Sequence, residues 1–335
     1  MFFSKKLKLI TYATCLSIII LCIVECLSAM WFGTIAKNEY KKQFTFFSDS
    51  LPITVRNYSY QQGLFTSKEV VDFNINSGVL TGIFATSGSS ESVVSIKLVT
   101  TVYNGIFAGL FTGHLVPTIA VAKSAIELQP SLDKTIKQIY ANKEFLSWSN
   151  VMYLTRGGEI VISSPAVQYE EAVSKFSLRT SGFTFTSDYD SNYNGFNNTF
   201  KLGSLELGLN DVSSFKVSNI EYVSNSHYSA NSLRVGSSKV SIDQIVLDNT
   251  DKILPSSFSL GSLASNILSI NIGDFLPSSD SNNFDLQHLS YHNYSNDDGK
   301  YFSTDISVKL DKILLESTAA GPFVVKAKLS HVLSN

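Results

Sequence analysis

The chain opens with one long apolar run, over residues 9–32, which consists mainly of Leu, Ile, Val and Cys. A membrane-spanning helix needs about 20 such residues. Trp31 and Phe32 end the run, where interfacial aromatic residues are expected. Lysines are concentrated before the run, at Lys5, Lys6 and Lys8. This asymmetry predicts that residues 1–8 form a cytoplasmic tail, that residues 9–32 form a signal anchor, and that the rest of the chain lies outside the cytoplasm.

A cleaved signal peptide is the alternative interpretation of the same run. The small residues Cys26 and Ser28 would then precede a cut before Ala29. The apolar stretch is longer than the 7–15 residues typical of a signal-peptide core, which favours the anchor. The chain's three cysteines all lie within this run. A domain that follows it therefore folds without disulfide bonds.

Beyond the run, the hydrophobic spacing first remains helical and then changes. Phe32, Ala36 and Tyr40 recur every four residues, which predicts a membrane-proximal helix or linker over 33–51 that ends at Pro52. Residues 117–147 are predicted to form two short helices with a break at Pro130.

Most of the remaining chain alternates apolar and polar residues. Val71, Phe73 and Ile75 show this period early, and Ile306, Val308 and Leu310 show it late. Such alternation predicts antiparallel strands with one solvated face. Residues 98–122 carry no charge and are interpreted as a buried strand with a covered loop rather than a second membrane span.

The predicted fold is therefore mainly β with few helices. A transmembrane helix is followed by one large antiparallel β-meander over residues 52–335, either sandwich-like or grooved. The two alternatives differ in how the sheet covers its apolar face: it folds onto itself, or it curls around a groove. The sequence pattern leaves both open.

Composition and motif searches exclude several classes of function. Only 16% of residues are charged and the net charge is −2, which argues against a nucleic-acid binder. The sequence contains no nucleophile elbow and no phosphate-binding loop. His288 and His292 stand about 13 Å apart on a predicted strand, too far to share one metal ion. We therefore predict no catalytic residue, no cofactor and no metal site, and a protein that is not an enzyme.

One segment, Tyr60-Gln61-Gln62-Gly63-Leu64-Phe65-Thr66-Ser67, has the form aromatic-x-x-Gly-apolar-Phe-Ser/Thr-Ser. The segment resembles the signature near the start of the YdgA-like bacterial proteins, domain of unknown function 945. Gly321 and Pro322, followed by Phe323, fit a second motif of that family. Where the family often has His-Gly-Pro, this chain has Tyr103-Asn104-Gly105-Ile106. The resemblance implies an inner-membrane anchor with the bulk of the chain in the periplasm, and it implies no particular activity.

The signature residues Tyr60, Gly63, Leu64, Phe65, Ser67, Gly321 and Pro322 are assigned a structural role. Gly63 is predicted to adopt positive φ at a tight connection. Leu64 and Phe65 are then predicted to plug the end of the sheet.

The functional prediction is a non-enzymatic, membrane-anchored protein of the bacterial inner membrane. Its 23 Phe and 15 Tyr residues suit a groove for a lipid-like or hydrophobic ligand. Two alternatives stay open. The protein is an envelope scaffold that binds other proteins, or it is a surface protein secreted after signal cleavage. The expected partners are the membrane and either a lipid or an envelope protein, with no nucleic acid.

Overall fold

The computed structural model describes residues 2–50, 53–76, 93–173, 175–209, 213–248, 283–315 and 318–333. The chain divides into two compact units. Unit 1 comprises residues 1–75, 95–128 and 148–159, and unit 2 comprises residues 76–94, 129–147 and 160–335. Antiparallel strands dominate and helices are few, which confirms the predicted fold class.

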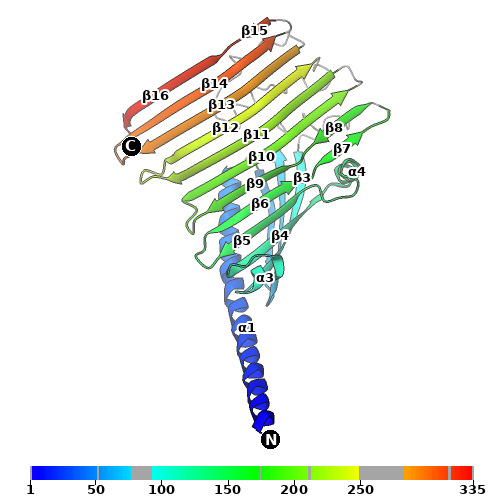
Figure 1. Ribbon diagram of the computed structural model, residues 1–335, viewed down its shortest axis with the longest axis vertical. Helices are drawn as coiled ribbons and strands as arrows, with labels where there is room; N and C mark the ends of the chain where they lie inside the picture. The colour runs from blue at the N-terminus through cyan, green and yellow to red at the C-terminus, as the bar shows by residue number, and fades with distance from the viewer. Residues whose placement is uncertain are drawn as a thin grey trace. The chain divides into compact units, whose positions relative to one another are not determined.

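Helix α1 (Phe2–Ser50) continues without a break from the predicted anchor through the predicted membrane-proximal helix (Figure 1). Thr14–Gln43 is long and apolar enough to cross a membrane. Pro52, the predicted end of the helix, lies outside the described residues. The side chains of residues 14–24 are exposed, whereas one face of the helix is buried from Ser28 onward.

The sheet of unit 1 has five strands in sequence order. They are β1 (Ile53–Gln61), β2 (Thr66–Asn76), β3 (Val93–Asn104), β4 (Thr118–Leu128) and β5 (Ser147–Tyr153). The short helix α3 (Ala108–Thr112) lies between β3 and β4. The buried face of α1 packs on this sheet, and the resulting core contains Phe32, Ala36, Tyr40, Val102, Ile119 and Met152.

The prediction of two helices over 117–147 is wrong for the first and confirmed for the second. Residues 118–128 form strand β4, whose first five residues are all buried. A short apolar run buried on both faces has no period, so its sequence does not distinguish a strand from a helix. Helix α4 (Pro130–Ile139) begins with Pro130 in its first turn, where proline is favoured. Residues 98–104 belong to β3 and residues 118–122 to β4, so the interpretation of a buried strand rather than a second membrane span is confirmed. The loop between them is not covered as expected, because Leu110, Leu115 and Val116 are exposed.

Unit 2 is an antiparallel meander that contains the remaining strands, apart from the first two residues of β6. They are β6 (Gly158–Ser164), β7 (Val167–Glu170), β8 (Phe176–Thr180), β9 (Phe183–Tyr189), β10 (Gly195–Leu209), β11 (Ser213–Tyr228), β12 (Arg234–Asp248), β13 (Asn283–Asp297), β14 (Tyr301–Leu315), β15 (Thr318–Ala320) and β16 (Phe323–Leu333). The strands from β9 to β14 pair in sequence order (Figure 1). Both β15 and β16 pair with β14, while β8 pairs with β7 and β10.

One face of this meander is apolar. Its core comprises Phe215, Val217, Ile245, Phe284, Leu286 and Leu289. Val217 lies opposite Ile245, and Ile245 opposite Leu286, so the apolar side chains form rows across the strands. In the described part of unit 2 the sheet is open, and no second sheet packs on it as in a sandwich.

Four neighbouring strands of unit 2 interrupt their alternation at the same level. In each strand two core residues stand three apart rather than two: Val217 and Ile220, Ile242 and Ile245, Leu286 and Leu289, Leu310 and Ile313. Between them lie Asn219, Asp243, His288 and Asp311, which drop out of the paired register. Asn219 and His288 have φ of 51° and 53°. An aligned line of polar, exposed residues therefore crosses the sheet, and the core continues on both sides of it.

Candidate functional site

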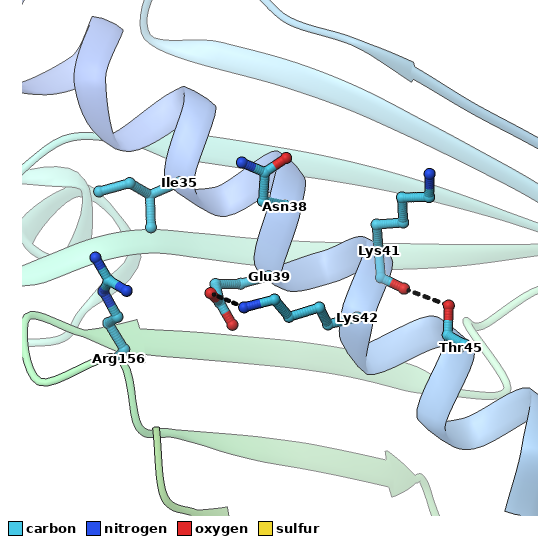
Figure 2. Close-up of a pocket in the computed structure, with 7 residues that line it drawn as sticks. All are labelled: Ile35, Asn38, Glu39, Lys41, Lys42, Thr45 and Arg156. Atoms are coloured by element: carbon cyan, nitrogen blue, oxygen red, sulfur yellow. Dashed lines mark hydrogen bonds and ion pairs between the residues drawn. The ribbon is translucent and has the colours of Figure 1, made fainter. Parts of the chain in front are cut away.

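An open cleft of about 750 Å³ lies in unit 1 between the C-terminal half of α1 and the turn after β5 (Figure 2). The cleft is lined by Ile35, Asn38, Glu39, Lys41, Lys42, Thr45 and Arg156. Helical spacing places residues 35, 38, 39 and 42 on one side of α1. Arg156 has φ of 68°, and its backbone N–H donates to the Tyr153 carbonyl at 2.8 Å.

Three cations and one carboxylate line the cleft. The Glu39 side chain is buried and accepts a hydrogen bond from Lys42 Nζ at 2.9 Å. Lys41 and Arg156 also line the cleft, and Figure 2 shows the ammonium group of Lys41 pointing away from Glu39, Lys42 and Arg156. The lining is therefore net positive and suits an anionic group, with Arg offering the bidentate geometry that phosphate or carboxylate accepts.

The signature segment, residues 60–67, comprises the end of β1, the β1–β2 connection and the start of β2. Ser67 is buried, and its Oγ accepts hydrogen bonds from Asn104 Nδ2 at 2.8 Å and from the Gly63 N–H at 3.3 Å. Tyr60 lies opposite Glu69 in the β1–β2 pair and packs against the core. Gln62 Nε2 donates to the hydroxyl of Thr34 at 3.2 Å. The segment therefore fastens the sheet to α1.

The structure corrects two predictions about this segment. Gly63 is not among the glycines with positive φ. A Cβ on Gly63 would instead collide with the Thr66 carbonyl oxygen, so the close approach of the backbone requires glycine there. Leu64 and Phe65 are 43% and 45% exposed, so neither side chain plugs the end of the sheet.

The second motif, Gly321-Pro322, belongs to unit 2 and connects β15 to β16. Gly321 has φ of 127°, and its Cα lies close to the backbone of Asp311 and Lys312 on β14. The signature residues thus fall into different units. Each set has its own local structural role.

A buried carboxyl group in unit 1 was not singled out from the sequence. Glu69 lies on the buried face of β2, and desolvation raises its pKa to about 6, while the neighbouring hydroxyls of Tyr58 and Thr100 offset part of that rise. Burial, with Glu69 nearby, raises the pKa of Tyr58 well above its usual value. The alternating pattern could have identified this residue. Glu69 lies two residues from each of the buried residues Ser67 and Val71, and residues two apart on a strand face the same side of the sheet.

In the described ranges, no cluster of three or more His, Cys, Asp or Glu residues is arranged to hold a metal ion. The fold and these sites define a β-rich protein with an apolar N-terminal helix that is packed into the first of its two units. The chain belongs to a family of bacterial proteins of unknown function, DUF945, whose family model matches residues 7–333. No curated protein and no solved structure matches it.

Proposed function

We propose that the protein is a module of the bacterial inner membrane, anchored by α1, that binds a lipid-like ligand along its periplasmic sheet without catalysing a reaction. The observation that carries the proposal is the one-sided apolar face of unit 2. The apolar helix and the bacterial family support the membrane location.

The anchor is supported by the exposure of α1. Between Leu16 and Leu27 its large apolar side chains are exposed all around the helix. A helix that is apolar on every side and lacks a protein cover is suited to lipid. The lysines at positions 5, 6 and 8 support a cytoplasmic N-terminus and a periplasmic location for both units.

The apolar face of unit 2 reaches the open edge of the sheet. Tyr222, Val240, Tyr291, Val308 and Val325 lie opposite one another in one row across five strands. Val240 and Tyr291 are buried, whereas Val325 is 52% exposed. Four strand spacings of ~4.8 Å make this row ~19 Å long. One leaflet contributes about 15 Å to the hydrocarbon core of a bilayer, so the row is long enough for an acyl chain.

The test compares two neighbouring valines on β16. Val325 lies opposite Val308 of the apolar face, and Val324 lies opposite the exposed Lys309. Their exposed fractions, 52% and 57%, are closely matched. The full chain is reconstituted with a photoreactive phospholipid, and crosslinked peptides are mapped by mass spectrometry. We expect Val325→Glu to abolish crosslinking to the unit 2 strands and Val324→Glu to leave it unchanged. Crosslinks confined to α1 in the unaltered chain would contradict lipid binding by the sheet.

A second candidate, an envelope scaffold, is favoured by the edge strand β16. Every described side chain of β16 is exposed, and among the described strands it pairs only with β14. A free strand edge accepts an additional strand from a partner protein. Crosslinks from the backbone edge of β16 to a protein, rather than to lipid, would favour this function.

A further inference from the structure

Two connections of unit 1 lie beside the same stretch of α1. The β1–β2 connection is held there by Gln62, whose Nε2 donates to the Met30 carbonyl at 3.4 Å and to Thr34 Oγ1 at 3.2 Å. The β3–β4 connection begins at Gly105, and a Cβ on that residue would collide with the Glu25 carboxyl group. Glu25 to Thr34 covers nine residue steps, or ~14 Å of helix axis. Both connections therefore lie beside one stretch of α1, residues 25–34.

Within this stretch of residues 25–34, α1 still presents apolar side chains on the face that points away from the sheet. Leu27, Met30 and Trp31 are 58–67% exposed, although Ala29 and Phe32 on the opposite face are buried in unit 1. A tryptophan next to an apolar span is typical of the membrane–water interface. This end of unit 1 thus lies beside the part of α1 where a membrane–water interface is expected.

The two connections themselves expose large apolar side chains. These are Leu64 and Phe65 in the first and Leu110, Leu115 and Val116 in the second, which we call the collar. Leu115 is 88% exposed. Residues 105–117 contain no Lys, Arg, Asp or Glu. Figure 1 shows α3, which carries Leu110, next to α1 near the point where the helix leaves unit 1 toward its N-terminus. Large exposed apolar patches mark contact sites.

The opposite end of the same strands is charged. Lys97 on β3 and Glu127 on β4 form an exposed ion pair, with Nζ and Oε2 2.6 Å apart. Glu127 stands nine residues along β4 from Thr118, which is ~30 Å from the collar end at ~3.3 Å per residue. Apolar exposure is therefore concentrated at the end of the strands where α1 continues as an apolar helix.

We propose that the collar inserts into the headgroup–acyl boundary of the bilayer that α1 crosses. Unit 1 then contacts lipid at three places: α1 and the two connections. The occupant is the bilayer because the connections that carry the collar lie beside the stretch of α1 where Leu27, Met30 and Trp31 are exposed. Apolar side chains at such a boundary bury ~5–10 Å into the membrane. The inference rests on the proposed anchor. It gives Leu64 and Phe65 a reason to be exposed, while Gly63 and Ser67 hold the connection in place.

Depth-dependent quenching of tryptophan emission tests the collar in the full chain. The native tryptophans are Trp31 and Trp148. Trp148→Phe leaves Trp31 as the reporter of the anchor. Phe65→Trp and Leu115→Trp, each made in a chain that also carries Trp31→Phe and Trp148→Phe, report the two connections. Glu127→Trp in that same background reports the far end of the strands and is the matched exposed control.

Each variant is reconstituted in phosphatidylcholine–phosphatidylglycerol vesicles, with and without lipid brominated in the acyl chain close to the headgroup. Circular dichroism shows whether each variant keeps its β content. We expect the brominated lipid to quench Phe65→Trp and Leu115→Trp to an extent comparable with Trp31, and to leave Glu127→Trp unquenched.

The remaining outcomes separate the collar from the anchor. If Trp31 is quenched and both collar reporters behave like Glu127→Trp, the collar is refuted and the anchor stands. If Trp31 is not quenched, the anchor is refuted and the collar with it. Quenching of Glu127→Trp to the level of Trp31 also refutes the collar, because the strands would then lie along the membrane.

Discussion

Glu69 is a carboxyl group that unit 1 buries among hydroxyl groups and apolar side chains. Its pKa is raised from 4.5 to about 6, chiefly by desolvation. Between these two pH values the folded state binds more protons than the unfolded state. The contribution of Glu69 to the free energy of unfolding therefore falls as pH rises through this window, and this contribution is constant above it. A shift of about 1.5 units corresponds to ~2 kcal/mol, an order-of-magnitude figure.

Glu69→Gln is expected to remove this pH dependence, because the amide is neutral at every pH. At pH 7.5 the variant should be more stable than the unaltered chain by about 1–2 kcal/mol. The measurement is the thermal unfolding midpoint of the full chain in detergent between pH 4.5 and 7.5. Lys68→Gln, at the exposed neighbouring position, is the control and should keep the original slope. An unchanged slope in Glu69→Gln would contradict the assignment.

At the residue scale, the sequence predicted which positions matter better than it predicted their conformation. The signature segment was recognised, but the sign of φ at Gly63 was wrong, since a glycine is required both for positive φ and for close backbone approach. Leu64 and Phe65 were expected to be buried because apolar side chains usually are. Their exposure depends on where the connection stands relative to α1, which no local pattern encodes.

Among the elements, β11 to β14 share one interruption that the alternation pattern concealed. Asn219 Nδ2 donates to Asp243 Oδ2 at 2.6 Å, and His288 Nδ1 lies 3.5 Å from Asp311 Oδ2. Positive φ is unfavourable for most L-residues, and Asn tolerates it better than others. Polar contacts between neighbouring strands and left-handed backbone at alternate strands therefore keep the interruption aligned.

Two substitutions at Asn219 separate backbone conformation from side-chain bonding. Asn219→Gly and Asn219→Val both lose the hydrogen bond to Asp243, but only glycine adopts φ of 51° without strain. We expect Asn219→Val to be less stable than Asn219→Gly by about 1–2 kcal/mol. Strand propensity alone predicts the reverse order, because Val favours strands and Gly disfavours them. Denaturant unfolding of the full chain, followed by circular dichroism, compares the two variants.

The elements that the sequence predicted well are those with a sustained period. Phe32, Ala36 and Tyr40 predicted the helical continuation of α1, and all three are buried on one face. Strand β4 was missed because Thr118–Ala122 is buried on both faces and shows no period. The spacing of three between Val217 and Ile220 reads as a break in a strand. Only the pairing of neighbouring strands shows it to be one continuous strand.

On the scale of the whole molecule, α1 has two parts that differ in the exposure of their side chains. Its first part exposes apolar side chains on all sides, and its later part, from Ser28 to Gln43, packs into unit 1. Asn150 Nδ2 donates to Gln43 Oε1 at 2.7 Å in this buried interface. Because the helix is continuous, unit 1 is joined to the predicted span without an intervening linker.

The fate of the N-terminus is the prediction on which this arrangement depends. Cleavage before Ala29 would leave Ala29, Phe32, Ala36 and Tyr40 in the core, so the fold of unit 1 does not require the span. It would remove Glu25, whose side chain lies against Gly105, and the buried Ser28, which donates to the Glu25 carbonyl at 3.0 Å.

We expect the span to be retained, since the apolar run exceeds the length of a signal-peptide core. The intact mass of protein extracted from carbonate-washed membranes should therefore equal that of the full chain. A periplasmic reporter enzyme fused after residue 335 should be active, and a cytoplasmic one inactive. A mature chain that starts at Ala29 and washes off the membrane would instead favour the secreted alternative, because a helix that starts there keeps too few apolar residues to cross a bilayer.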